Sequence, residues 1–446
     1  MEVLTQQELE LDGVFAPGSN EYKRLQKPFS QLNWIPADYV AEPKTIEELS
    51  VLVKQAAERR IRARFWTGHM LPDSPQSGLH IGGYQMKHLS FDEARGIVTI
   101  GAGVKQPELD RYLIPRGRAA VTSTSCSNSV VGVALVGGYG WLSAMHGSCL
   151  NNMVSARVVL ADGSVVTCSE HERTELFFAI RGSGGSFGIV AEASFHTHPQ
   201  KQDVFWGTLT TSIQELESTL DLLRRVEMNL DSRAMISARL EHSPTSTQLV
   251  IRLFFNGTEA EARNHFAPLL NLANTATEAS MVRFDEVSAQ MDRLPDHQRG
   301  SRYAYTGVNL QTFDTLELAQ ICQDFMDQIG SLDGVRYAVL GFDTRSFPAS
   351  VANSEGCGAN AAKIMTYMRV QWLEPTRDTD IENAIKKLGN AWRSKVVLGQ
   401  KGYPAFCRTG DLKPEDIYGQ NLQRLRDLKA RYDPHSMWVD RSILAA

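Results

Sequence analysis

Glycines gather at three separated places in this sequence, each with the composition of a loop that can meet a ligand. The longest, residues 121–147, reads VTSTSCSNSVVGVALVGGYGWLSAMHG; residues 181–188 read RGSGGSFG, and Thr67–His69 read TGH. In the longest stretch, the glycines that surround a short apolar run are Gly132, Gly137, Gly138 and Gly140. Glycine has no side chain, so backbone amides in such loops can approach a ligand closely. The three clusters predict one extended ligand, flat or anionic, held by several loops.

Two known motifs come close to matching RGSGGSFG, and neither fits. The dinucleotide fingerprint GxGxxG requires a glycine where Phe187 stands, and no helix pattern follows. Gly184–Gly188 matches GxSxG, but the nucleophile elbow of serine hydrolases needs a helix directly after it, and IVAEASF alternates like a strand. His196 and His198 have the spacing of two metal ligands, but nothing nearby completes a ligand set. We therefore expect surface histidines and no metal site.

Length and composition limit the class of protein. A chain of 446 residues is long enough for two domains, each with its own core. The net charge of -5 offers no basic surface for a nucleic acid, so a small-molecule partner is favoured. The N-terminal MEVLTQQELELDG lacks the basic start and apolar run of a secretory signal, and no stretch approaches the roughly 18 apolar residues of a membrane span. With six scattered cysteines and no CxxC pair, we expect reduced thiols, a cytoplasmic location and no membrane partner.

The elements that must position the glycine loops are predicted as a mixed α+β domain. Residues 45–60 form a helix with Thr45 as its cap, and IRARFW follows as a strand that leads into TGH. A helix is expected over 106–113, a hairpin around Asp162-Gly163, and a strand at IVAEASFHTHP. We place this first domain at residues 1–202.

A second domain is predicted over residues 203–402, where the glycine clusters stop and longer amphipathic segments begin. Helices are expected over 213–230, 258–272, 316–329 and 380–392, and strands over 234–240, 247–255, 303–310, 334–342 and 364–372. This order fits an antiparallel sheet with helices on one face. The last segment, 403–446, contains a helix ended by Asp433-Pro434 and is expected to return to the first domain.

Five motifs, in order, resemble one family. IRARFWTGH, GIVTIGAGV, the run from VVGVALVGGYGWLSAMHG to ADGSVV, ELFFAIRGSGGSFGIV and the terminal YGQNLQRLRDLKARYDPHSMW look like the FAD-linked oxidases of the vanillyl-alcohol oxidase superfamily, berberine-bridge-enzyme-like branch. The match covers about residues 34–199 and 403–446. The resemblance implies a PCMH-type FAD-binding fold, and we interpret the glycine stretches as walls of a flavin dinucleotide site.

The resemblance also implies roles for individual residues. His69 stands where the family has a histidine bonded to the flavin 8α carbon, so FAD is expected to be covalent through His69. The residues that resemble the diphosphate- and ribityl-lining segment are Gly132, Gly137, Gly138, Gly140, Gly147 and Asn152, and Tyr139 is expected to contact the cofactor. Those that resemble the second segment and its strand are Arg181, Gly182, Gly184, Gly185, Gly188, Ile189 and Val190. Tyr418 and Asn421 match the YGxN element that reaches back to the flavin. Backbone amides in the glycine segments would then neutralise the pyrophosphate without a lysine.

Two positions depart from the family pattern. Many members bond a cysteine to flavin C6, but an ungapped count puts Ser125 there and Cys126 one residue further on. An asparagine common two residues after a tyrosine is replaced here by Ala405, after Tyr403. A second covalent bond would need a one-residue shift, and one polar contact near the flavin is expected to be lost.

The leading functional hypothesis is an FAD-dependent oxidase that moves a hydride from a phenolic, alcohol or amine carbon of a specialised metabolite to flavin N5, with O2 as acceptor. A base from the second domain must take the accompanying proton. We favour Tyr403 because it lies in a matched segment; Tyr303, Tyr305 and Tyr367 are the other candidates. Two alternatives stay open. One is a cyclase that keeps the flavin as a scaffold, and the other is a binding protein that has the fold but no chemistry.

Overall fold

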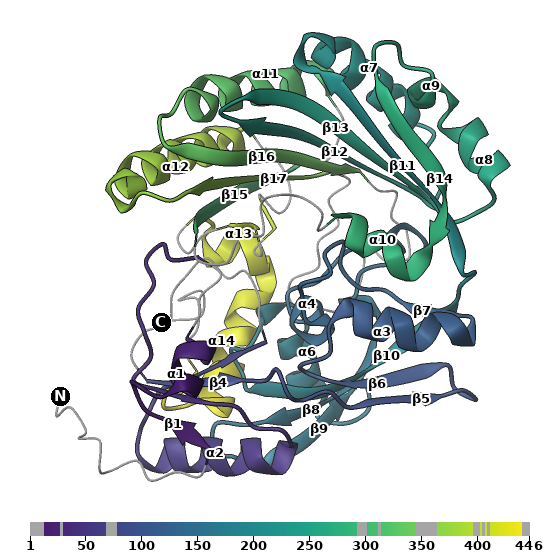
Figure 1. Ribbon diagram of the computed structural model, residues 1–446. Helices are drawn as coiled ribbons and strands as arrows, with labels where there is room; N and C mark the ends of the chain where they lie inside the picture. Colours follow the sequence, from purple (N-terminus) through teal and green to yellow (C-terminus); the bar gives the residue numbers. More distant parts are fainter. Residues whose placement is uncertain are drawn as a thin grey trace.

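The computed structural model describes residues 13–26, 30–67, 78–291, 301–310, 314–344, 364–395, 402–403, 406–407 and 411–438. Within them the chain builds three sheets, of four, six and seven strands (Figure 1). The two smaller sheets come from the N-terminal part (residues 13–199), and the large one from the central part (residues 203–395). The expected α+β class, with an antiparallel second sheet, is confirmed.

The N-terminal part surrounds the glycine stretches with short elements. Its four-stranded sheet has the order β1 (Val14–Phe15), β2 (Tyr39–Ala41), β4 (Leu79–Gly82), β3 (Ala63–Trp66). The other sheet has the order β5 (Leu89–Asp92), β6 (Ile97–Gly101), β10 (Ile189–Pro199), β8 (Met153–Val159), β9 (Val165–Ser169), with β7 (Arg118–Ala120) also paired to β10. Its helices are α1 (Asn20–Leu25), α2 (Ile46–Glu58), α3 (Gln106–Leu113), α4 (Val130–Ala134), α5 (Ser143–His146) and α6 (Thr174–Ser183). The Thr45 hydroxyl accepts from the Glu48 amide at 3.1 Å, so α2 begins where its cap predicts.

The central part is one antiparallel sheet with helices on its outer face. The strand order is β14 (Ala276–Arg283), β11 (Asp203–Ser212), β13 (Ser246–Phe255), β12 (Ala234–Ser243), β16 (Val335–Thr344), β17 (Ile364–Trp372), β15 (Arg302–Leu310). The outer helices are α7 (Leu216–Glu227), α8 (Glu259–His265), α9 (Ala267–Leu270), α11 (Thr315–Phe325) and α12 (Asp378–Ser394), whereas α10 (Phe284–Met291) contacts α3 of the N-terminal part. Figure 1 shows α7, α11 and α12 on the side of the sheet that faces away from the N-terminal part.

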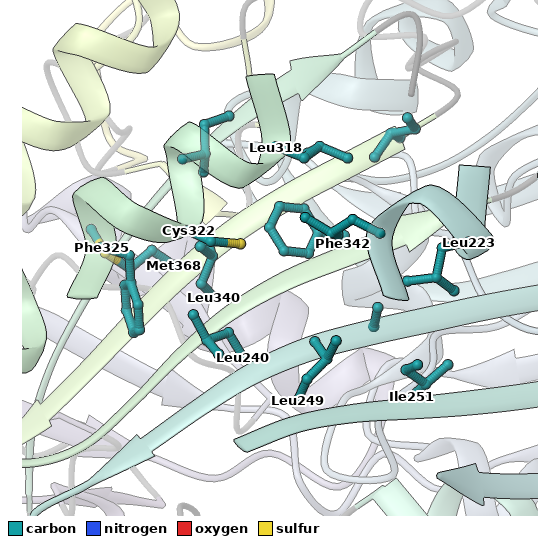
Figure 2. Close-up of a cluster of buried hydrophobic side chains, with 14 of the residues drawn as sticks. Leu223, Leu240, Leu249, Ile251, Leu318, Cys322, Phe325, Leu340, Phe342 and Met368 are labelled. Carbon is teal, nitrogen blue, oxygen red and sulfur yellow. The ribbon is translucent and has the colours of Figure 1, made fainter. Parts of the chain in front are cut away.

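Alternation along the strands builds the core beneath these helices. Leu240 of β12, Leu340 and Phe342 of β16 and Met368 of β17 point to the helical side and are fully buried. Figure 2 shows them against Leu318, Cys322 and Phe325 of α11. Side chains on a strand alternate between faces, so the residues between them point towards the N-terminal part.

The last segment packs on the N-terminal part. It contains α13 (Pro414–Tyr418) and α14 (Leu422–Tyr432), and Leu425 and Leu428 of α14 share a core with Phe177 of α6. Arg424 pairs with Glu175 at 2.6 Å, and the Ala63 amide donates to the Met437 carbonyl at 3.0 Å. These contacts hold α14 beside α6 and the end of the chain beside β3.

Three elements of the central part were not expected from the sequence: β11, β14 and α10. Strand β14 pairs with β11 along its whole length, with Asp203 opposite Arg283 and Thr210 opposite Ala276. On β14, Glu278 is exposed, and the strand lies at the sheet edge, so its sequence lacks the apolar alternation that marks a buried strand. In the part of the chain that the structure describes, no helix has the length and apolar character needed to cross a membrane.

Candidate functional site

The three glycine stretches meet in space. A Cβ placed on Gly132 would lie 3.5 Å from Oγ1 of Thr67, which puts the first residue of TGH beside the stretch 121–147. The Leu135 carbonyl accepts from the amides of Gly182 and Gly184 at 3.1 and 2.9 Å, which joins the stretch 121–147 to the stretch 181–188. Three loops separated in sequence therefore contact one another.

Several glycines at this junction are required because other parts of the chain pack against them. A Cβ on Gly140 would lie 2.5 Å from the Thr122 carbonyl oxygen, and one on Gly188 would lie 2.7 Å from that of Val159. Gly138 has φ +73° and would place a Cβ 2.4 Å from Cγ1 of Val133. Any other residue at these positions would force backbone to move.

The hydrogen-bond partners of these glycine amides differ from those that we expected. We expected them to face an anionic ligand, but in this structure they already donate within the protein. Gly132 donates to Ser129 Oγ, Gly138 to the Tyr403 hydroxyl, and Gly140 to Ser143 Oγ. The amides of Gly137 and Gly147 donate to the carbonyls of Ala134 and Ser143. These glycines allow close packing of the loops, and their contact with the cofactor stays a prediction.

Gly184 and Gly185 differ from the other glycines because little lies against them. Only Cγ1 of Val136, at 3.9 Å, comes within 4 Å of a Cβ on Gly184. For Gly185, no atom of the described residues does so. Gly184 has φ +70°, so it needs glycine for conformation rather than for space. The stretch 181–188 is therefore open at these two residues.

The loop that carries Ser125 and Cys126 lies against the glycine stretch. A Cβ on Gly140 would lie 2.9 Å from the Ser123 carbonyl, so residues 122 and 123 pass directly over it. The Ser125 amide donates to Ser123 Oγ at 3.3 Å, and its hydroxyl bonds with Ser127 Oγ at 3.1 Å. Cys126 is half-buried, whereas the other described cysteines are buried. The hydrogen bonds of Ser125 therefore stay within the loop that also carries Cys126.

Asn152 holds the turn around Gly147 rather than an open surface. Its side-chain nitrogen donates to the carbonyls of His146 and Ser148 at 3.0 and 2.8 Å, and its oxygen bonds with His198 Nε2 at 2.7 Å. The rings of His146 and His198 stack at 3.7 Å. His196 is exposed, as expected, but His198 is half-buried and was wrongly expected at the surface. Burial, and then the charge of His146, lower its pKa to about 4.

The remaining residues expected at the cofactor lie near the same junction, mostly in the core. Ile189 and Val190 begin β10 and are buried in the two clusters on either side of it. Tyr418 ends α13 inside the core that contains Val130 and Ala134 of α4, and Asn421 follows in a short 3-10 turn. Arg181 is buried with its guanidinium 4.4 Å from the Phe177 ring. His69 and Ala405 lie outside the described residues.

Tyr403 joins the glycine stretch to the large sheet. Its hydroxyl oxygen accepts from the Gly138 amide at 2.9 Å, and its ring is buried. The Tyr403 and Phe406 rings are 5.3 Å apart, and the Phe406 ring is 4.8 Å from that of Tyr367 on β17. A row of aromatic rings therefore connects the glycine loop with the inner side of the sheet.

The other tyrosines considered as bases lie on the sheet itself. Tyr303 and Tyr305 are on β15 and Tyr367 is on β17, all buried. Burial, and then neighbouring tyrosines, raise the pKa of Tyr305 well above its ordinary value. Burial also raises the pKa of Tyr367, although Arg239 works against it. A base needs its phenol to lose a proton readily, so Tyr305 and Tyr367 are disfavoured in that role.

A buried polar face is the part of the site that sequence reasoning missed. It occupies the inner side of the large sheet, opposite the helices, and its members are Ser237, Arg239, Glu241, Arg252, Tyr337, Asp343, Tyr367, Arg369 and Gln371, each at most 9% exposed. We call this set the polar face. The pattern ISARLE in β12 carries the signal, since polar residues alternate with apolar ones. Such alternation normally marks a solvent-exposed face, and the sequence alone does not show that the N-terminal part covers it.

Two contacts of the polar face involve its carboxylates. Arg252 and Glu241 form a buried ion pair at 3.4 Å. The Tyr139 hydroxyl, from the glycine stretch, donates to Asp343 Oδ2 at 2.6 Å. Tyr139 was expected to contact the cofactor; the structure shows that its hydroxyl reaches a carboxylate of the large sheet.

Comparisons with known proteins agree with this geometry. The family described as "FAD binding domain" matches residues 37–169, and the family described as "Berberine and berberine like" matches residues 407–441. The FAD-linked oxidoreductase pgmH of Aspergillus terreus is 26% identical over 391 residues, which cover 82% of this chain and 78% of that protein.

Solved structures show the same fold over almost the whole chain. The BBE-like 1 protein of Physcomitrella patens superposes with a TM-score of 0.84 at 17% identity, covering 97% of this chain and 96% of that one. Glucooligosaccharide oxidase of Acremonium strictum, which carries a 6-S-cysteinyl, 8α-N1-histidyl FAD, gives a TM-score of 0.83 at 18% identity and covers 96% and 95%.

The fold and the matched segments define a two-part flavoprotein with an FAD-binding half and a separate antiparallel sheet. The chain carries an FAD-binding domain and a berberine-like C-terminal segment and is an FAD-linked oxidoreductase, as the resemblance of its five motifs implied.

Proposed function

We propose that this chain is an oxidase that removes a hydride from a phenolic, alcohol or amine carbon of a small specialised metabolite and uses O2 as the electron acceptor. The observation that carries the proposal is the position of Tyr403, between the glycine junction and the polar face. The names of the relatives support redox chemistry, and the buried polar side chains support binding of a small polar molecule.

The residues present fit an FAD dinucleotide. Three loops converge there, the backbone at Gly184 and Gly185 is open, and the match to the FAD-binding family includes the other two loops. We propose that the junction of Gly132, Gly137–Gly140 and Gly184–Gly188 holds the dinucleotide, together with Tyr418 and Asn421. When bound, FAD supplies hydride acceptance and reaction with O2, which no side chain can provide.

Tyr403 is the residue that we propose as the proton acceptor. Its oxygen accepts the Gly138 N–H, and a donor on that oxygen stabilises the negative charge that forms when the phenol loses its proton. The Phe406 ring beside it excludes water from one side. Tyr403 is therefore placed to take the proton of a substrate bound between the glycine junction and the polar face.

We also propose that the flavin is covalently bound through His69. Thr67, two residues earlier, lies beside Gly132, so the TGH loop starts at the junction. The mass of the intact protein after acid denaturation tests the bond, because only a covalent adduct survives. His69→Ala should release FAD, whereas Cys126→Ser is the matched test for a second bond. An adduct that survives His69→Ala would overturn the attachment point.

The redox proposal itself is tested by adding candidate phenols, alcohols and amines anaerobically. A substrate should bleach the flavin absorbance, and admitting air should restore it with consumption of O2. Product formation without O2 uptake would instead support the cyclase alternative.

A further inference from the structure

Arg239 is a buried cation whose interactions within the protein are weak. Its side chain is only 8% exposed, on the central strand β12. Its Nε lies 3.4 Å from Ser237 Oγ, and its Nη2 lies 4.0 Å from Met291 Sδ. Among the described residues, no carboxylate oxygen lies within 4 Å of its guanidinium. A guanidinium has five N–H donors, and burying it without an anion costs several kcal/mol.

Neither of the two acids near Arg239 lies within 4 Å of its guanidinium, and each has another partner. Glu241 pairs with Arg252, and Asp343 accepts from Tyr139. Burial works against the charge of Arg239, but Tyr367, Asp343 and Glu241 together raise its pKa, so the guanidinium stays protonated. In the part of the chain that the structure describes, Arg239 is therefore a buried positive charge that no carboxylate contacts directly, although Asp343 and Glu241 act on it from a longer distance.

Gly341 and Tyr367 lie between Arg239 and the proposed site. Arg239 is opposite Gly341 on β16, and Gly341 is opposite Tyr367 on β17. A Cβ on Gly341 would lie 2.3 Å from Cζ of Tyr367, so the phenol lies over the glycine and extends towards Arg239. The guanidinium carbon is 5.7 Å from the Tyr367 ring, which connects through Phe406 to Tyr403.

We propose that Arg239 binds a carboxylate of the substrate, so that this enzyme acts on a small carboxylic acid. A planar guanidinium matches a carboxylate through two parallel hydrogen bonds, and the neighbouring Tyr367 hydroxyl offers a further donor. The substrate is then fixed at its acid group by Arg239, while its reacting carbon lies towards Tyr403. This inference rests on the proposed function, because it names the class of substrate for the same site.

The test compares aromatic acids with their amides on the FAD-bound protein. Benzoate, phenylacetate and cinnamate are titrated by calorimetry beside benzamide, phenylacetamide and cinnamamide, which keep the shape but lose the charge. At least one acid should bind ten times more tightly than its amide. Arg239→Gln should remove that preference, Arg239→Lys should retain part of it, and Arg225→Gln, an exposed arginine on α7, should leave it unchanged.

A second measurement needs no ligand. Arg239→Met should raise the melting temperature of the free protein, because it removes a buried charge that lacks a counter-ion. Arg252→Met is the matched control and should lower it, because Glu241 would lose its partner.

Three results would overturn the proposal. The first is that the unaltered protein binds the acids no more tightly than the amides, or binds none of these compounds. The second is that the preference for acids persists in Arg239→Gln. The third is that Arg239→Gln loses FAD, which would assign Arg239 to the cofactor. If the oxidase proposal alone fails, the acid preference remains while no compound bleaches the flavin; if only this inference fails, neutral compounds still bleach it.

Discussion

At the scale of single residues, Tyr403 has two separable roles, as an anchor and as a proton acceptor. Tyr403→Phe removes the acceptor of the buried Gly138 amide, which should cost about 1–3 kcal/mol and lower the melting temperature. If Tyr403 takes the substrate proton, flavin reduction should also slow by about 100-fold or more. Anaerobic stopped-flow absorbance measures that rate. Tyr305→Phe is the matched control, and an unchanged rate in Tyr403→Phe would leave only the anchoring role.

The glycines of the junction also differ residue by residue. Gly140→Ala should reduce the FAD content and melting temperature, because its Cβ would lie 2.5 Å from the Thr122 carbonyl oxygen and the loop must shift. Gly185→Ala introduces the same methyl group where the described residues leave open space, so stability should change by less than about 0.5 kcal/mol. The absorbance ratio of flavin to protein measures the FAD content, and thermal unfolding measures the stability of both variants. Equal loss in the two variants would argue against packing as the reason for glycine at 140.

At the scale of elements, a carboxyl group of α3 makes stability depend on pH. Asp110 is fully buried where α3 packs near α10, and burial raises its pKa from 3.8 to about 8, with Asp285 adding to the effect. The native state therefore favours the protonated acid. Its contribution is complete below pH 3.8 and is lost as the pH rises from there through about 8.

Asp110→Asn should remove this dependence, because an amide stays neutral. The melting temperature of the variant should exceed that of the unaltered protein at pH 8, and the difference should shrink towards pH 5. Thermal unfolding followed by circular dichroism at both pH values measures it, with the exposed Asp380→Asn as control. A constant difference across that range would mean that Asp110 is already ionised in the folded protein.

Elements with local signals could be predicted from the sequence, and those without could not. The helix over residues 106–113 and the hairpin at Asp162-Gly163 were found because a periodic face and a turn dipeptide lie within the segment itself. Strand β14 was missed because it is an edge strand with exposed residues, and helix α10 because only its packing on α3 makes it specific. The convergence of three glycine loops followed from their composition, but the hydrogen bond of the Gly138 amide depends on Tyr403, far away in the sequence.

The polar face belongs to the scale of the whole molecule, because it exists only where two parts of the chain close on each other. Strand β12 shows an alternation that is typical of a solvent-exposed face, yet Arg239 and Glu241 are buried. The apolar side of this contact is formed by Trp141 against Trp206 and Phe254, at 5.0 and 5.4 Å. No signal within one segment predicts which face a distant loop will cover.

The contact between Tyr139 and Asp343 should couple the two parts of the molecule. Tyr139→Phe removes the donor to Asp343 Oδ2, and Oδ1 of the same carboxylate has no hydrogen-bond partner, so the loss should cost about 1–3 kcal/mol. In an Asp343→Asn background the same change should cost less, because no buried charge is left without a donor. Melting temperatures of the four proteins of this double-mutant cycle measure the coupling, with Tyr112→Phe on α3 as control. Additive effects would show that the hydroxyl contributes nothing to joining the glycine stretch to the sheet, and the polar face would then be closed by the Trp141 cluster alone.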